Sequence, residues 1–333
     1  MSAVGFATRV LTSARSHRNE DRVFGNRVYS EPLLNRPAQE PEIISVPTAD
    51  GVTLHVQAYG PADGDIVVLA HGWTCSLEFW YPQINVLAQR CRVIAYDQRG
   101  HGRSTRGTAK PATDQLADDL AAVMQAVVPA RRKAVVVGHS MGGMTIMAWA
   151  ARHPDQVRTK ARAVMLANTG AHDLVAEQVF IPRFQARKYP KAVGRVVLGA
   201  PFPYLPVLPI RSLVKYIASA PHATSEQIDF TTRVVFGCNP FVRAAWGSML
   251  ATMDIEKAAA NLTVPTVVLA GSADKMTPVV HSQAIAEALD AKGALERFTV
   301  IEGAGHMANI DSTSEFNAEL ERLIYGKRRR RTA

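Results

Sequence analysis

The chain has 333 residues, 47% of them hydrophobic and 20% charged, and a formal net charge of +9. This composition is typical of a globular protein with enough residues for a substantial core, in one elaborated domain or two. No apolar run approaches the roughly 18 to 20 residues needed to span a bilayer. Residues 1–27 also lack the continuous apolar stretch of a secretory signal. We therefore expect neither a transmembrane nor a secreted protein.

The cysteines and the charge distribution point to a cytoplasmic setting. Cys75, Cys91 and Cys238 are scattered without a metal-binding or redox spacing, which favours reduced thiols. Residues 327–331 carry +5. Such a tail favours peripheral contact with an anionic membrane surface, and a disordered, solvated end is the alternative. No aromatic residues are interleaved with these charges, so no nucleic-acid partner is expected.

Short apolar runs alternate with helical patterns along most of the chain. Residues 1–40, in contrast, are polar and weakly patterned, which predicts an extension packed loosely on the domain. Residues 49–51 form a turn signal between two strands of a hairpin, and Thr113 is expected to cap a helix. The predicted strands are Ile43–Val46, Val52–Tyr59, Ile66–Ala70, Arg92–Tyr96, Val135–Val137, Ala163–Ala167, Val264–Ala270 and Arg297–Ile301. The predicted helices are Leu77–Gln89, Thr113–Val127, Met141–Ala151, Val279–Leu289 and Ser312–Tyr325.

Repeated strand–helix units predict an α/β fold, with a mostly parallel central sheet covered by helices on both faces. The alternation stops from Thr169 to about Asp254, which predicts an insertion. We therefore divide the chain into four parts. They are an N-terminal extension (1–40), a core (41–170 and 256–326), an insertion (171–255) and a basic disordered tail (327–333).

The stretch Gly138-His-Ser-Met-Gly142 has the pattern G-x-S-x-G between a predicted strand and a predicted helix. This context is typical of a serine whose hydroxyl is raised at the end of a strand, over the start of a helix. Glycines on both sides of Ser140 leave room for the sharp turn. The start of the helix supplies free N–H groups and a partial positive charge. The alternative is a glycine-rich turn with no catalytic role.

A serine hydroxyl needs a base within hydrogen-bond reach, and the base needs a partner that fixes its tautomer. His306 is the best candidate among ten histidines, because it follows a predicted strand in a Gly-Ala-Gly-His loop. Asp274 lies on the loop after the preceding strand, and Asp173 is the fallback acid. Because binding groups gather at the carboxyl ends of parallel strands, these side chains are expected to meet there.

Five motifs together resemble the α/β-hydrolase fold superfamily, over roughly residues 42–325 apart from the insertion. They are His71-Gly72, Asp97-Gln-Arg-Gly-His-Gly-Arg-Ser104, Gly138-His-Ser-Met-Gly-Gly143, Gly271-Ser-Ala-Asp274 and Gly303-Ala-Gly-His306. The serine distinguishes the chain from the epoxide hydrolase and dehalogenase branches, which use an aspartate nucleophile. His71-Gly72-Trp73 with Ser-Met-Gly-Gly looks like the branch of cofactor-free haloperoxidases and related esterases, with lipase-like members. Many of these relatives have Pro where this chain has Thr74.

The resemblance implies roles for individual residues. Ser140 would be the nucleophile, His306 the base and Asp274 the acid. The backbone N–H groups of Trp73 and Met141 would form the oxyanion hole. Trp73 and His139 are also expected beside the substrate. No metal and no organic cofactor is expected.

Other conspicuous residues have structural explanations. His71 and His139 are expected to shape their loops rather than transfer protons. Asp97, Arg99 and Ser104 are expected to hold a turn together rather than touch the substrate.

By the same resemblance, the insertion would form a helical cap or lid over the site. No acidic residue occurs between Glu177 and Glu226, whereas seven Lys and Arg residues do, around the proline-interrupted apolar stretch 196–210. Basic residues beside an apolar segment suit an anionic amphiphile or a membrane surface. The alternative is a cap with its own small core, kept soluble by its charges. We expect an apolar ester to enter beneath it.

The sequence thus predicts a serine ester hydrolase that acts on a small-molecule apolar ester through an acyl-enzyme. The alternatives are a haloperoxidase-like perhydrolase, a carbon–carbon bond hydrolase that acts on a diketone, and a ligand receptor that has kept the pocket.

Overall fold

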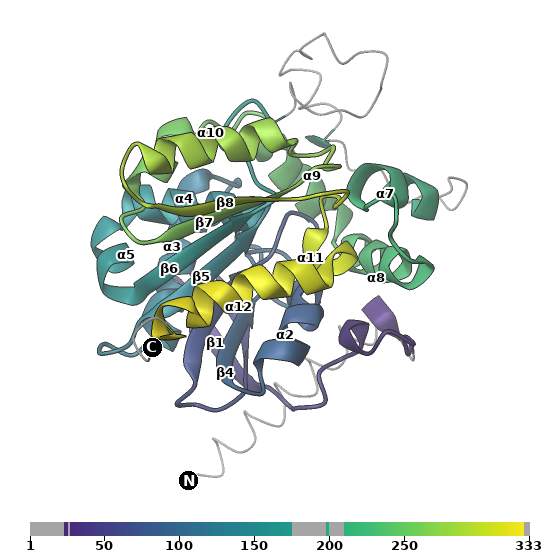
Figure 1. The fold of residues 1–333 in the computed structure, drawn as a ribbon, viewed down its shortest axis with the longest axis horizontal. Helices are drawn as coiled ribbons and strands as arrows, with labels where there is room; N and C mark the ends of the chain where they lie inside the picture. The colour runs from purple at the N-terminus through teal and green to yellow at the C-terminus, as the bar shows by residue number, and fades with distance from the viewer. Residues whose placement is uncertain (1–22, 26, 175–197, 200–209, 330–333) are drawn as a thin grey trace.

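The computed structural model describes residues 23–25, 27–174, 198–199 and 210–329 (Figure 1). Its centre is an eight-stranded sheet of order β1-β2-β4-β3-β5-β6-β7-β8. Only β2 runs against its neighbours, and the others are parallel. The strands are β1 (Glu42–Pro47), β2 (Thr53–Tyr59), β3 (Asp65–Ala70), β4 (Cys91–Tyr96), β5 (Ala134–His139), β6 (Ala161–Ala167), β7 (Thr266–Gly271) and β8 (Leu295–Ile301). The predicted fold class is confirmed.

Helices cover both faces of the sheet (Figure 1). One face carries α3 (Thr113–Val127), α4 (Met141–Arg152), α5 (Pro154–Lys160) and α10 (Val279–Asp290), with the 3-10 helix η4 (Glu256–Asn261) packed against α4 and α10. The other face carries α2 (Tyr81–Leu87), α11 (Ala308–Asp311) and α12 (Thr313–Arg329), together with the short 3-10 helices η1 (Pro32–Leu34) and η2 (Leu77–Trp80).

The strands alternate between two cores, one on each face. In β3, Ile66 and Val68 pack in the core under α3 and α4, whereas Val67 and Leu69 pack in the core under α2 and α12. Because the central strands β3, β5 and β7 are buried on both faces, they are nearly continuous apolar runs rather than alternating polar and apolar residues. This explains why runs such as residues 66–70 were recognisable from the sequence.

Three local predictions were wrong. Thr113 is the first residue of α3 and Ala112 is its cap, with Gln115 Oε1 accepting from the Ala112 amide at 3.1 Å. The extension was expected to pack loosely, but Tyr29 and Leu34 are almost fully buried. Helix α12 continues to Arg329, so the first three residues of the expected disordered tail are helical. Residues 1–22 and 330–333 lie outside the described part.

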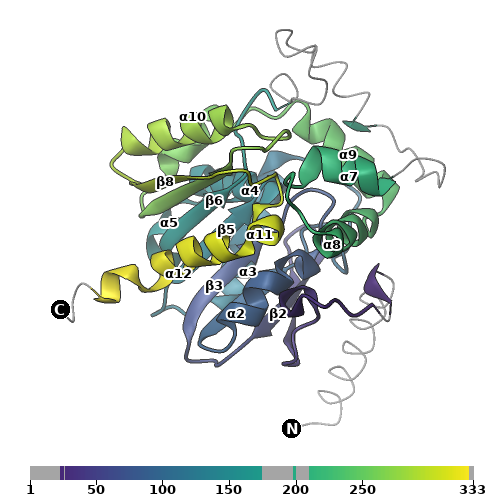
Figure 2. The same cartoon turned by 45° about the vertical axis from the view of Figure 1, so that its right-hand side comes forward.

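Between β6 and β7, where the strand–helix alternation was predicted to stop, the described residues include three longer α-helices, followed by η4. They are α7 (Ile210–Ala218), α8 (Ser225–Phe236) and α9 (Pro240–Leu250). Figures 1 and 2 both show them grouped beside α11, at one end of the sheet. We call residues 171–255 the cap. Most of its basic and apolar stretch, 175–197 and 200–209, lies outside the described residues. No helix in the described ranges is both long enough and apolar enough to cross a bilayer.

Candidate functional site

Ser140 sits between the end of β5 and the start of α4, with φ 53° and ψ −119°. A residue with a side chain seldom adopts a positive φ, and such strain concentrates at functional sites. The surrounding structure enforces the turn. A Cβ at Gly138 would lie 2.4 Å from the Gly142 carbonyl oxygen, and one at Gly142 would lie 2.0 Å from the Ala70 carbonyl oxygen. Both obstacles are backbone atoms, so the glycines are required for this geometry.

His306 and Asp274 are in direct contact. His306 Nδ1 lies 2.8 Å from Asp274 Oδ2, and both side chains are buried. A carboxylate can only accept, so Nδ1 carries the proton and Nε2 is left with its lone pair. The loop of His306 begins with Gly303 at φ 74°, as expected of a glycine-rich connection. The fallback acid Asp173 instead lies beside His172, at 3.8 Å.

Four further donors surround the Asp274 carboxylate. The amides of Met276 and Thr277 donate to Oδ1 at 2.8 and 2.9 Å, and Thr277 Oγ1 and Asn168 Nδ2 donate to Oδ2 at 2.8 and 3.0 Å. Burial by itself would raise the pKa of Asp274. His306 and these hydrogen bonds outweigh burial, so the pKa is lowered. The acid is therefore ionised at neutral pH.

Asn168 is a site residue that sequence reasoning missed. It follows β6 directly, at φ 47°, and its Nδ2 donates both to Asp274 Oδ2 and to the Gly305 carbonyl at 3.1 Å. The sequence feature that could have identified Asn168 is an Asn at the carboxyl end of a buried strand. Asn tolerates a positive φ better than most residues, so it suits a sharp turn there.

His139 lies between the serine and histidine loops. Its Nε2 is 2.7 Å from the His306 carbonyl oxygen, and the two imidazole rings are 4.8 Å apart. Burial, and to a smaller extent the neighbouring His306, lower the pKa of His139 to about 3. His139 is therefore a neutral ring that donates to the His306 backbone. This contact agrees with the expected role in shaping a loop.

The loop after β3 passes beside the serine, since a Cβ at Gly72 would lie 3.2 Å from Ser140 Cβ. His71 braces it: its Nε2 accepts from the Gln98 amide at 3.0 Å, and its Nδ1 lies 2.8 Å from the Gly72 carbonyl oxygen. Thr74 has φ 66°. Proline cannot adopt that angle.

The turn after β4 is held together as expected. Asp97 accepts from the amides of Leu77 and Arg103 at 2.7 and 2.9 Å, and Ser104 Oγ donates to the Asp97 carbonyl at 2.6 Å. Arg99 pairs with Asp119 at 2.6 Å. These contacts stabilise the core beside the site.

A cavity of about 200 Å³ contains both Ser140 and His306 on its wall. Its core side is formed by the loops after β3, β5, β7 and β8, and its cap side by α7, α8 and α9. The described lining is mainly apolar, and Arg243 is its only charged residue. The residues are Trp73, Thr74, His139, Ser140, Leu213, Val214, Ile217, Ala218, Val235, Phe236, Arg243, Met276, His306 and Met307. Among the predicted residues, Trp73, His139, Ser140 and His306 therefore share one cavity.

The cap is attached to the two loops that flank the serine. Trp73 Nε1 donates to the Arg243 carbonyl in α9 at 2.9 Å. The Met307 amide donates to the Ala218 carbonyl of α7 at 3.1 Å, and the Ala220 amide donates to Asp311 at 2.7 Å. Burial raises the pKa of Asp311 to about 6. The cap thus contacts the loops that carry Trp73 and His306.

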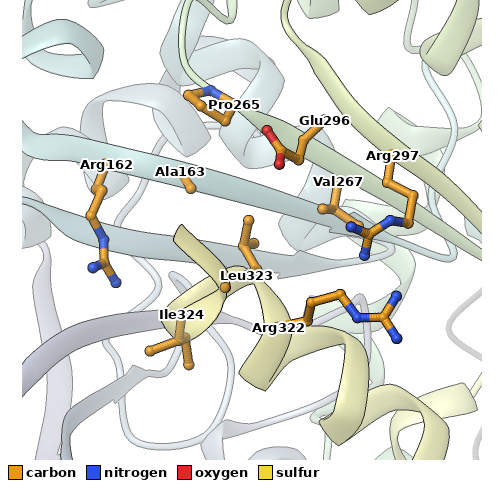
Figure 3. Close-up of a pocket in the computed structure, with 10 residues that line it drawn as sticks. Arg162, Ala163, Pro265, Val267, Glu296, Arg297, Arg322, Leu323 and Ile324 are labelled. Carbon is orange, nitrogen blue, oxygen red and sulfur yellow. The ribbon is translucent and has the colours of Figure 1, made fainter. Parts of the chain in front are cut away.

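A second hollow, of about 220 Å³, lies at the amino ends of β6, β7 and β8, opposite the serine (Figure 3). Arg162, Arg297 and Arg322 line it, and Figure 3 shows them with Glu296 around the end of α12. Arg297 and Arg322 both pair with Glu319, at 2.6 and 3.2 Å. The described residues of its lining include no Ser, Cys or His, so the cavity beside Ser140 is the candidate active site.

Comparisons with known proteins bear on the fold of the chain. A family model of the alpha/beta hydrolase fold matches residues 65–313. RutD of Variovorax paradoxus, which carries a provisional name as a carbamate hydrolase, is 30% identical over 271 residues, which are 80% of this chain and 94% of that protein. A bifunctional esterase/perhydrolase of Acinetobacter calcoaceticus is 39% identical over 117 residues, 35% of this chain and 42% of that protein.

Among solved structures, an esterase from Exiguobacterium antarcticum superposes with a TM-score of 0.69 at 20% identity. The superposition covers 84% of this chain and 98% of that one. At this identity the likeness shows the fold alone.

Proposed function

Because the chain belongs to the α/β-hydrolase fold family, we propose that it is a serine ester hydrolase with Ser140, His306 and Asp274 as its catalytic triad. The observation that carries the proposal is the 2.8 Å contact between His306 and Asp274 at a cavity that also contains the strained Ser140. Asp274 fixes the tautomer in which His306 Nε2 can accept a proton.

In the proposed reaction, Ser140 Oγ attacks the ester carbonyl while His306 takes the hydroxyl proton. The amides of Trp73 and Met141 bind the oxygen that gains charge. Met141 is the first residue of α4, so its N–H has no acceptor within the helix. The alcohol leaves with the proton from His306, and water then releases the acid from the acyl-enzyme. The apolar cavity walls favour an ester with an apolar body.

Labelling with a fluorophosphonate, together with turnover of p-nitrophenyl esters of graded acyl length, tests the proposal. The wild type should be labelled and should turn over many times. Ser140→Ala should abolish labelling and lower kcat by about 10⁴-fold or more, with an unchanged circular dichroism spectrum. Labelling that persists in the variant would place the nucleophile elsewhere. A single slow turnover with retained product would instead indicate a receptor.

A second candidate activity is perhydrolysis, favoured by the similarity to an esterase/perhydrolase over residues that make up about a third of this chain. It would use the same triad, with hydrogen peroxide in place of water as the acyl acceptor. Peracid formation measured beside ester hydrolysis distinguishes the two. A carbamate substrate and a ring-cleavage diketone belong in the same panel, because attack on a carbonyl is common to all of them.

A further inference from the structure

We propose that the end of the sheet opposite Ser140 binds the surface of an anionic phospholipid bilayer. Strands β1 and β3–β8 all begin at this end, because they run in the same direction. We define the basic edge as the four residues before each of these strands, the first three residues of each strand, and residues 319–329 of α12. This edge lies away from the proposed triad, so its binding of a bilayer does not depend on the proposed function.

Helix α12 ends at the basic edge. Arg90, just before β4, pairs with Glu321 at 3.0 Å, and Cys91 Sγ lies 2.9 Å from the Tyr325 hydroxyl. Figures 1 and 2 both show the end of α12 on the side of the molecule away from the cap helices α7 and α8. The hollow at the amino ends of β6, β7 and β8 belongs to the same edge, and three arginines of the edge line it (Figure 3). The charges of α12 therefore add to those at the starts of the strands.

The basic edge holds the excess positive charge of the chain. It contains fourteen Lys and Arg residues but seven Asp and Glu residues, a net charge of +7. Arg330 and Arg331 follow directly in the sequence and bring this to +9, which is the net charge of the whole chain. All the other residues together are therefore neutral. An excess of charge at one end of a protein attracts a surface of the opposite sign and orients the protein on it.

Two cations of the basic edge are held by backbone carbonyls. Arg132 donates to the carbonyls of Ala62 and Asp63, at 2.9 and 3.2 Å. Lys133 Nζ donates to the Arg158 carbonyl at 2.6 Å. A carbonyl fixes the position of a cation without neutralising it, so these charges remain able to attract anionic headgroups.

A lipid surface fits the basic edge better than a nucleic acid does. Proteins that bind single-stranded nucleic acids stack the bases on aromatic rings. Tyr325 is the one aromatic residue in the basic edge, and its ring lies beneath the Arg90 guanidinium, 5.0 Å from the ring centroid. The exposed large hydrophobic side chains among the described residues all lie outside the edge. Attachment should therefore be electrostatic, without insertion into the bilayer, and should weaken as salt is added.

Attachment by the basic edge would hold the cap away from the bilayer. The cavity beside Ser140 lies at the carboxyl ends of the strands, between the core and α7, α8 and α9. A molecule that enters this cavity would therefore come from the aqueous side rather than from the lipid.

Co-sedimentation of the full chain with vesicles tests the proposal. Vesicles of phosphatidylcholine alone are compared with vesicles of equal parts phosphatidylcholine and phosphatidylserine. We expect binding only to the anionic vesicles, and release in about 1 M salt, where the Debye length is about 3 Å. Arg131→Glu with Lys292→Glu reverses two exposed charges of the basic edge. The partition coefficient of this double variant should fall by about 10- to 100-fold.

The matched control reverses two exposed charges at the other end of the sheet. Arg106→Glu with Lys110→Glu makes the same change of net charge in the loop after β4, and it should change the partition coefficient by less than about threefold. Equal losses in the two double variants would overturn the proposal. An edge variant that binds like the wild type would also overturn it, and so would binding to a single-stranded RNA but not to anionic vesicles.

A fluorophore reports which end of the molecule meets the bilayer. Gln89→Cys introduces a thiol in the basic edge and Phe241→Cys introduces one in the cap, both at exposed positions, whereas the native cysteines are buried. A quencher attached to the lipid headgroups should reduce the fluorescence more at position 89 than at position 241. The reverse order, or equal quenching, would overturn the proposal. None of these readouts measures turnover, so a failure of the ester hydrolase proposal would leave them unchanged.

Discussion

The core and the cap form opposite walls of one cavity, and they are built under different constraints. On the core side, Ser140 is held by backbone atoms that leave no room for a side chain at Gly138 or Gly142. On the cap side, α7, α8 and α9 contribute side chains to the cavity, and α7 and α9 are hydrogen-bonded to the loops that carry His306 and Trp73. The core thus has little freedom to vary around the serine, whereas the cap can change its side chains without disturbing it. The proposed chemistry resides in the core and the proposed specificity in the cap.

The largest effect should come from replacing Asp274, the proposed acid on the core side of the cavity. Asp274→Asn keeps the size of the side chain but removes the charge that fixes the His306 tautomer, so kcat should fall by about 10³- to 10⁴-fold. Steady-state hydrolysis of a p-nitrophenyl ester measures it. The control is Asp173→Asn, because Asp173 lies beside His172. The kcat of this variant should stay within about threefold of the wild-type value. Equal losses in both variants would contradict the assignment of Asp274.

The next largest effect concerns the backbone of the core. Gly142→Ala places a Cβ 2.0 Å from the Ala70 carbonyl oxygen, so the free energy of unfolding should fall by about 1–3 kcal/mol and activity should fall with it. Urea denaturation measures the stability. Gly326→Ala in α12 has no atom closer than 3.7 Å to the new Cβ, and it should instead stabilise by about 0.5–1 kcal/mol. A Gly142→Ala variant as stable as the wild type would show that the turn can relax.

A low pH should lower the stability of the core through its buried histidines. Burial lowers the pKa of His71 to about 3 and that of His101 to about 4, from an unfolded value of 6.5. These rings gain protons on unfolding, so stability is lost as the pH falls below about 6.5, by about 2 kcal/mol for each ring at pH 5. Asp97 has the opposite effect on stability, because burial raises its pKa to about 7. Its carboxyl takes up a proton more readily in the folded protein, so its contribution to stability rises as the pH falls.

Urea denaturation at pH 7.5 and at pH 5 checks this expectation. His101→Gln removes one titrating ring, so the loss of stability between the two pH values should be smaller in this variant than in the wild type. If the stability of the variant depended on pH as that of the wild type does, His101 would have to be protonated at pH 5 in the folded protein.

The smallest effect tests how the two parts are joined. Trp73→Phe deletes the hydrogen bond from Trp73 Nε1 to the Arg243 carbonyl, which is worth about 1 kcal/mol. Amide hydrogen exchange in α9 should become faster. Trp149→Phe also deletes an indole hydrogen bond, to Gln156 at 2.6 Å in the core, and should lower global stability without a selective change in α9. The same exchange pattern in both variants would mean that Trp73 does not attach the cap.

Parts of this arrangement could be predicted from the sequence because local rules govern them. The strands β3 and β6 were predicted to within two residues, since strands buried on both faces are continuous apolar runs. The proximity of Ser140, Asp274 and His306 could be predicted because each lies in a loop after a parallel strand, and such loops meet at one edge of the sheet.

The remaining site residues depend on contacts between distant segments. Asn168 touches Asp274 and Gly305 only after β6, β7 and β8 have paired. Arg243 reaches the cavity because α9 packs against Trp73, 170 positions earlier in the sequence. The pattern of polar and apolar residues within one segment does not indicate such a contact. The close packing of Tyr29 in the extension was missed for the same reason, because it depends on Asp229 and Phe230 in the cap.

The order of the elements, with β8 and α12 after the loops of Ser140 and Asp274, has a consequence for how the protein is made. His306 follows β8, and the core beneath that edge is covered by Phe316, Leu320 and Ile324 of α12. During translation, a nascent chain that has already produced Ser140 and Asp274 still lacks its proposed base. A polypeptide that stops before about residue 325 also exposes the part of the sheet that α12 covers, which favours aggregation. Synthesis therefore completes the proposed triad only once β8 and the loop that follows it have been made.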